Sequence, residues 1–140
     1  FQQQQTIIDL GEHALAHVYH EGDGFALKID GDESLDSVNA KLASIGGQIS
    51  EEVGRIYFAN FCNFDRVRSF HMVMQGEQGK VTVFVIPDNE EHQVIDQFSD
   101  GKMHGETLEL ENARLVFVAE QVQSFAQLKS KLKQRMLFSA

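Results

Sequence analysis

Apolar residues recur with a helical period in three parts of the chain, which predicts three helices. The first covers Thr6–His20, and the second opens at Ser34, a favourable N-cap, and stops at Gly46–Gly47. The third opens at Ser124, and Gln127 three residues later completes a capping box. The predicted buried stripes are Ile7, Leu10, Ala14 and Val18, then Leu35, Val38, Leu42 and Ile45, then Phe125, Leu128, Leu132 and Met136.

Five other stretches alternate between apolar and polar positions, which predicts β-strands. They are Arg55–Phe61, Arg66–Gln75, Lys80–Ile86, Met103–Leu110 and Ala113–Ala119. Ile56 and Phe58 are predicted on one face of the first strand. Gly76–Gly79 has the composition of a hairpin turn. The strand Lys80–Ile86 is apolar on both faces, so we expect it in the centre of a sheet.

The helices and strands are segregated along the chain, which predicts an α+β fold. We expect a mostly antiparallel five-stranded sheet with the helices packed on one face. Two weaker patterns predict a small strand at Phe25–Ile29 and a short helix at Glu90–Gln97. Residues 1–140 are expected to form one soluble domain, with Gln2–Gln5 as the end of a linker. Because residue 1 is Phe rather than Met, we expect the chain to be a fragment or a processed product.

Composition excludes several classes of protein. The 140 residues are 42% hydrophobic, too many for a disordered chain, and the single Cys excludes a disulfide scaffold. No apolar stretch approaches the 18 residues that a membrane span needs. The formal net charge of −9 repels polyanions, so nucleic acid is not expected as a partner. The candidate basic patches form no recognisable binding motif; they are Arg55, Arg66 and Arg68, and the tail residues Lys129, Lys131, Lys133 and Arg135.

The first predicted helix carries His13, His17 and His20 at offsets of 0, 4 and 7. Imidazoles with this spacing lie within one sector of a helix and can share a metal ion. Two other interpretations stay open. The histidines can be ordinary residues at a half-exposed helix edge, paired with Glu21 or Asp9, or they can sense protons.

Cys62 lies at the end of one predicted strand, and His71 lies on the next. Cys62 is either a small buried apolar residue or, together with His71, a metal ligand or redox thiol. Met72 and Met74 carry sulfur atoms of the kind that copper(I) binds. They share a face with Phe70, however, so packing in the core is the favoured interpretation, and His71 is predicted on the opposite face.

Motifs of common catalytic sites are missing from the sequence. Neither the metalloprotease pattern H-E-x-x-H nor the hydrolase pattern G-x-S-x-G occurs. Carboxylate residues are abundant but are scattered over predicted loops. Nothing in the sequence resembles an assembled catalytic site.

Three longer stretches resemble a known family. They are HALAHVYHE, GRIYFANFCNFDRVRSFHMVMQGEQGKVTVFVIP and FSDGKMHGETLELENARLVFVAE, within His13 to Gln134. The family consists of uncharacterised bacterial inner-membrane proteins with a short cytoplasmic part, one transmembrane helix and a periplasmic domain. The hairpin and the final strand and helix are more distantly similar to the periplasmic part of membrane-bound anti-sigma regulators.

This resemblance implies a non-catalytic sensor or regulatory domain on the periplasmic side of the inner membrane. Its partners would be the membrane, through the upstream anchor, and a sigma factor, through the cytoplasmic part. A second hypothesis is a protein that binds zinc or copper with His13, His17, His20, Cys62 and His71. A third is a structural domain that forms a homodimer.

Overall fold

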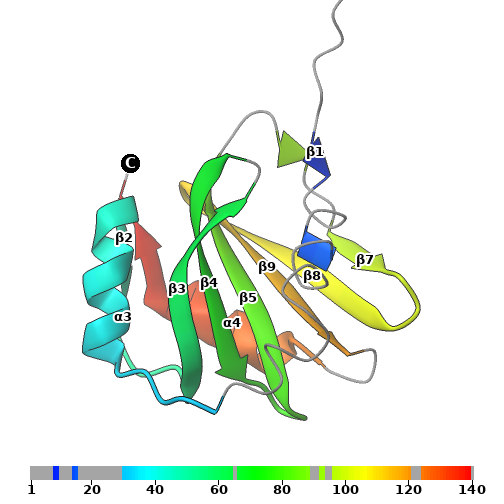
Figure 1. Cartoon of the computed structure of the whole chain (residues 1–140), viewed down its shortest axis with the longest axis horizontal. Coiled ribbons are helices and arrows are strands. Elements are labelled where there is room, and N and C mark those ends of the chain that lie inside the picture. Colours follow the sequence, from blue (N-terminus) through cyan, green and yellow to red (C-terminus); the bar gives the residue numbers. More distant parts are fainter. Residues whose placement is uncertain are drawn as a thin grey trace, which may run out of the picture.

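The computed structural model of the chain describes residues 8–9, 14–15, 30–64, 66–88, 92–93, 96–120 and 124–139. A six-stranded antiparallel sheet with the order β3-β4-β5-β9-β8-β7 forms its centre (Figure 1). The strands are β3 (Ile56–Phe64), β4 (Val67–Gln75), β5 (Lys80–Pro87), β7 (Gln97–Ser99), β8 (Met103–Leu110) and β9 (Ala113–Glu120). Within these described ranges, no helix is long and apolar enough to cross a membrane.

The sheet consists of two three-stranded meanders that meet where β5 pairs with β9. Tight turns make each meander possible. Arg66 and Asn112 adopt positive φ angles of 66° and 70° after β3 and β8, respectively. Between β4 and β5, the Gly76 N–H donates to the Gly79 carbonyl over 2.7 Å, as expected for the predicted hairpin turn.

One face of the sheet is covered by two helices and a small second sheet. These are α3 (Leu35–Leu42), the 3-10 turn η1 (Ala43–Ile45), α4 (Ala126–Arg135), and strands β2 (Gly47–Ile49) and β10 (Met136–Phe138), which pair antiparallel. In Figure 1, α3 stands beside β3 and α4 crosses behind the central strands. We call this side of the sheet the helix-covered face.

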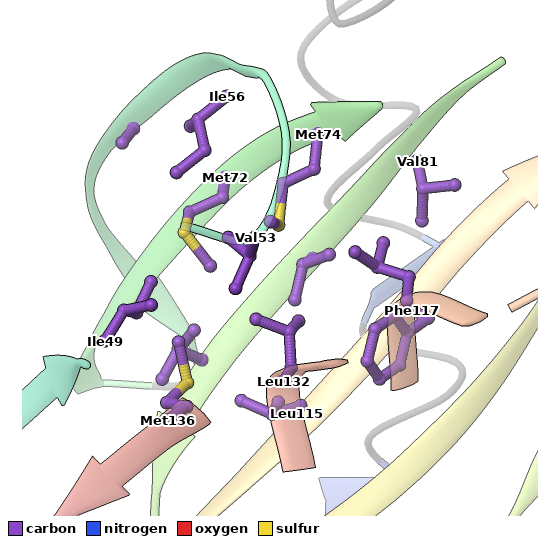
Figure 2. Packing of buried hydrophobic residues seen from close by; sticks show 14 of the residues in the cluster. Ile49, Val53, Ile56, Met72, Met74, Val81, Leu115, Phe117, Leu132 and Met136 are labelled. Carbon is purple, nitrogen blue, oxygen red and sulfur yellow. The ribbon is translucent and has the colours of Figure 1, made fainter. Parts of the chain in front are cut away.

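Apolar side chains fill the space between the helices and the sheet. Figure 2 shows Met72, Leu115 and Leu132 among the side chains of this layer. The sheet contributes alternate residues of its central strands, such as Val83 and Phe117, which pair in register and are fully buried. These alternating apolar residues therefore all point toward this layer, as expected for a strand with one face against the helices.

The other side of the sheet, which we call the opposite face, carries a second apolar cluster. Its buried members are Ala14, Phe64, Phe84, Ile86, Met103, Val116 and Val118, with Leu15, Cys62, Val67 and Phe98 packed against them. Ala14 and Leu15, which adopt a helical conformation, come from a part of the chain far from the sheet strands in sequence. Both faces of the central strands are therefore buried, as the two-sided apolar pattern of Lys80–Ile86 predicted.

The predicted α+β class, the antiparallel sheet and the helices on one face are confirmed. The sheet has six strands rather than five, because Gln97–Ser99 pairs with β8. This strand overturns the predicted helix at Glu90–Gln97, as does the two-residue strand β6 (His92–Gln93). Strand β6 pairs parallel with β1 (Ile8–Asp9), which contradicts the start of the predicted helix Thr6–His20.

Three local predictions also need correction. Ile56 and Phe58 pair with Met74 and Val73, so a register shift between them places them on different faces. Helix α4 begins at Ala126, with no side-chain cap, because Ser124 Oγ accepts only from the Ala126 N–H, at 3.3 Å. The second helix ends as predicted at Gly46, in left-handed conformation, but Gly47 starts β2. The predicted strand Phe25–Ile29 lies outside the described residues.

Candidate functional site on the opposite face of the sheet

Polar residues that are buried in the described part of the chain all lie on the opposite face. They are Ser69, His71, Thr82 and Thr107, from strands β4, β5 and β8. The sheet register fixes this placement, because each of them pairs with a residue of that face. The pairs are Ser69 with Cys62, His71 with Phe84, Thr82 with Val118 and Thr107 with Val116. The helix-covered face has a purely apolar buried layer, so the two faces differ in chemistry.

The imidazole of His71 is enclosed by aromatic rings and is only 2% exposed. It stacks on Phe84 with 4.9 Å between the ring centroids, and the ring of Phe58 meets it edge-on at 5.5 Å. These rings come from the strands on either side of β4, so the sheet register brings them together.

Cys62 lies on the same face, diagonally across from His71, because Cys62 pairs with Ser69 and Asn60 pairs with His71. Its side chain is half-buried against the apolar cluster that contains Ala14. Cys62 and His71 therefore share a side of the sheet. His71 also lies opposite Met72 and Met74, which are fully buried in the helix-covered layer, as favoured by the sequence.

The remaining predicted ligands, His13, His17 and His20, lie outside the described residues. Ala14, the sequence neighbour of His13, is packed on the opposite face with 0% exposure. Among the residues that the structure describes, no three His, Cys, Asp or Glu side chains gather closely enough to hold a metal ion.

A hydroxyl group on this face lacks a hydrogen bond. The Oγ1 atom of Thr107 is buried and has no partner in the described structure. Replacing Thr107 with Val removes the hydroxyl and keeps the branched shape, so we expect stability to rise by about 1 kcal/mol. Chemical denaturation followed by circular dichroism measures this change, and Thr107→Ala, which removes the methyl as well, should not stabilise the protein.

Sequence reasoning missed a polar hollow at the edge of the sheet where β7 meets β8. It has a volume of about 460 Å³ and is lined by Gln97, Phe98, Ser99, His104, Gly105 and Glu106. Two of these residues also contact the C-terminal part of the chain, because Lys129 Nζ of α4 lies 3.0 Å from Glu106 Oε1 and His104 stacks on Phe125 with 4.6 Å between the ring centroids. No local pattern could reveal the hollow, since its lining depends on the pairing of Gln97–Ser99 with β8.

Several cations lie over aromatic rings. Arg55 and Lys80 both lie over the ring of Tyr57, at 4.2 and 4.6 Å from its centroid. Arg68 lies 4.0 Å from the ring centroid of Phe61, near the end of β3. These contacts give the basic residues of the first meander a role in its packing.

Comparison with known proteins places the chain in a family. The model of the family described as "Protein of unknown function (DUF3379)" matches residues 1–136. Neither the curated proteins nor the solved structures contain a match to the chain. Because the match covers nearly the whole sequence, this chain belongs to the DUF3379 family, whose function is unknown.

Proposed function

We propose that this chain is a non-catalytic sensor or regulatory domain on the periplasmic side of the bacterial inner membrane. In this proposal a transmembrane helix upstream of residue 1 anchors it, as the resemblance of its three long stretches implies. The family name adds no activity, so support for the proposal comes from how the described residues are packed.

The supporting observation is the cover of the opposite face. Ala14 is fully buried among Phe84 and its apolar neighbours, although it lies far from the sheet strands in sequence. A segment that leads toward the anchor is thus docked beside the face that holds His71. A ligand, proton or partner that favours the undocked state would shift the population and change the strain on the anchor.

Localisation is the first test of this proposal. A fusion of the complete gene to alkaline phosphatase, placed after residue 140, should be active, because that enzyme matures only in the periplasm. A matching β-galactosidase fusion should be inactive. The reverse pattern would place the domain in the cytoplasm and end the proposal.

A narrower form of the proposal makes the full protein an anti-sigma factor. The contact with the sigma factor would then lie in the cytoplasmic part, outside this chain. Co-expression of the complete gene with the sigma factor encoded beside it, followed by purification, should recover a complex. If the complex is lost when only this chain is expressed, the result agrees with a contact in the cytoplasmic part. If the complete protein forms no complex either, the anti-sigma form of the proposal is rejected.

Metal binding is the second candidate function, favoured by the shared face of Cys62, His71 and Ala14. Zinc or copper would then be held by these two side chains together with His13, His17 or His20. Elemental analysis of untagged protein should find one metal ion per chain, and the double variant Cys62→Ser, His71→Ala should lose it. Substoichiometric metal and no rise in melting temperature with added zinc or copper would exclude this function.

A further inference from the structure

Strand β3 is an edge of the large sheet, and only its first half is covered in the described structure. The Glu33 N–H donates to the Ile56 carbonyl over 2.8 Å, and Gly31 lies so close to the Tyr57 carbonyl that a Cβ atom would come within 2.5 Å of that oxygen. Lys41 Nζ then donates to the Ala59 carbonyl over 2.8 Å. This cover ends at Ala59.

Beyond that point lies the stretch Asn60–Phe64, which we call the open edge. Its register shows which backbone groups point outward. Phe64 and Val67 pair across the two-residue turn that joins β3 to β4, and the groups of alternate residues in an antiparallel strand point to opposite sides. The Ala59 carbonyl points outward to Lys41, so the backbone groups of Phe61 and Asn63 point outward as well, and those of Cys62 point to β4.

Among the described residues, hydrogen bonds to these outward groups are few. The Phe61 N–H donates to the side chain of its neighbour, with 2.9 Å to Asn60 Oδ1. In the part of the chain that the structure describes, no other strand pairs with this side of β3. Unpaired strand edges are templates for another strand, and proteins usually guard them with charges, prolines or a covering segment.

We propose that the open edge pairs antiparallel with the open edge of a second copy of this chain, with Cys62 opposite Cys62. The stretch runs from the first residue beyond the Lys41 contact to the end of the strand, and Cys62 is its middle residue. Only this register pairs all five positions. It places Phe61 opposite Asn63 of the other copy and Asn63 opposite Phe61, so the outward N–H and carbonyl groups of both residues face partners in the second chain. The Phe61 N–H would exchange Asn60 Oδ1 for the Asn63 carbonyl.

Charge supports a second copy as the occupant. The chain carries a net charge of −9, which repels another copy over most of its surface, yet none of the five residues of the open edge is charged. Asn60 and Asn63 are exposed, and Phe61 is half-buried under Arg68. Two copies can therefore approach at a strip that carries no acidic residue and presents two amides and the Phe61 ring beneath Arg68.

The contact is small, so we expect a weak and reversible dimer rather than an obligate one. It is independent of the proposed periplasmic role, since it needs only the folded chain.

The single cysteine allows a direct test. In the proposed register the two Cys62 residues form a pair without backbone hydrogen bonds, with Cα atoms about 4.5 Å apart, which a disulfide can span. Diamide should therefore convert the chain to a covalent dimer. Two thiols lose two protons and two electrons, one S–S bond forms, and the diazene is reduced to the hydrazine. Cys62→Ser should give no covalent dimer.

The matched control moves the thiol along the same edge. In the double variant Cys62→Ser, Asn60→Cys, residue 60 faces Phe64 of the other copy, so the two thiols lie four positions apart, roughly 14 Å. Although residue 60 is more exposed than residue 62, cross-linking should be at least tenfold slower than in the parent chain. Equal or faster cross-linking of this variant would overturn the proposed register.

Backbone pairing is tested separately from the thiol. Asn63→Pro removes an outward N–H at an edge position where proline is tolerated, so it should slow cross-linking at least tenfold, whereas Asn63→Ser should change it less than twofold. Circular dichroism confirms that each variant is folded. Sedimentation velocity of reduced parent chain should show a concentration-dependent dimer, and a strict monomer at every concentration would overturn the proposal even if Asn63→Pro fails to fold.

Discussion

Replacing Phe84 with Ala is expected to lower the free energy of unfolding by about 3–5 kcal/mol. Phe84 is fully buried in a central strand, where it stacks on His71 and lies 5.4 Å from the ring of Phe64. The substitution removes a whole ring from a packed layer and leaves a cavity beside the imidazole. Urea denaturation followed by circular dichroism measures the loss.

The control for this experiment is Leu137→Ala. Leu137 is 58% exposed, so its truncation should change stability by no more than about 0.5 kcal/mol. A loss of less than about 1 kcal/mol for Phe84→Ala would mean that the opposite face is not a packed core. That outcome would also remove the basis for a sensor built on the cover of this face.

The second large effect is expected from Ala14→Asp. Ala14 is fully buried in the cluster of the opposite face, where a carboxylate would be desolvated among apolar side chains at a cost of several kcal/mol. The protein can avoid this cost by undocking the segment around Ala14 from the sheet. Amide hydrogen exchange should therefore become faster in β5 and β9, while α4 keeps its protection.

Ala126→Asp serves as the matched control, because it places the same charge at an exposed alanine in the first turn of α4. Acidic residues are favourable at that end of a helix, so protection should be unchanged. Exchange in Ala14→Asp that is indistinguishable from the parent chain would show that Ala14 contributes nothing to the cover.

The alternating patterns of the long strands predicted the structure well. The helical patterns at Thr6–His20 and Glu90–Gln97 missed the short strands β1, β6 and β7. The strand Lys80–Ile86 and its central position followed from alternation on both faces, and the stripe that includes Leu128 and Leu132 is buried as expected. Strands β2 and β10 have three residues each, too few for a period to emerge. Their pairing joins distant parts of the chain, so only tertiary packing determines it.

The candidate site was predictable only in part. Alternation along β4 places His71 on the face opposite Met72, but the rings that enclose it belong to other strands. Phe58 reaches His71 because the register shift after Ile56 moves it to the opposite face, and no pattern in the sequence signals that shift.

The pairing of β10 with β2 has a consequence for how the protein is made. Met136–Phe138 must align with Gly47–Ile49, and Ser139 donates to the Gly46 carbonyl over 2.9 Å beside them. At about 5–20 residues per second, a ribosome delivers the second strand roughly 4–17 seconds after the first. During that interval Met136 cannot yet cover Ile49. The nascent chain should therefore be a substrate for chaperones that bind exposed apolar segments.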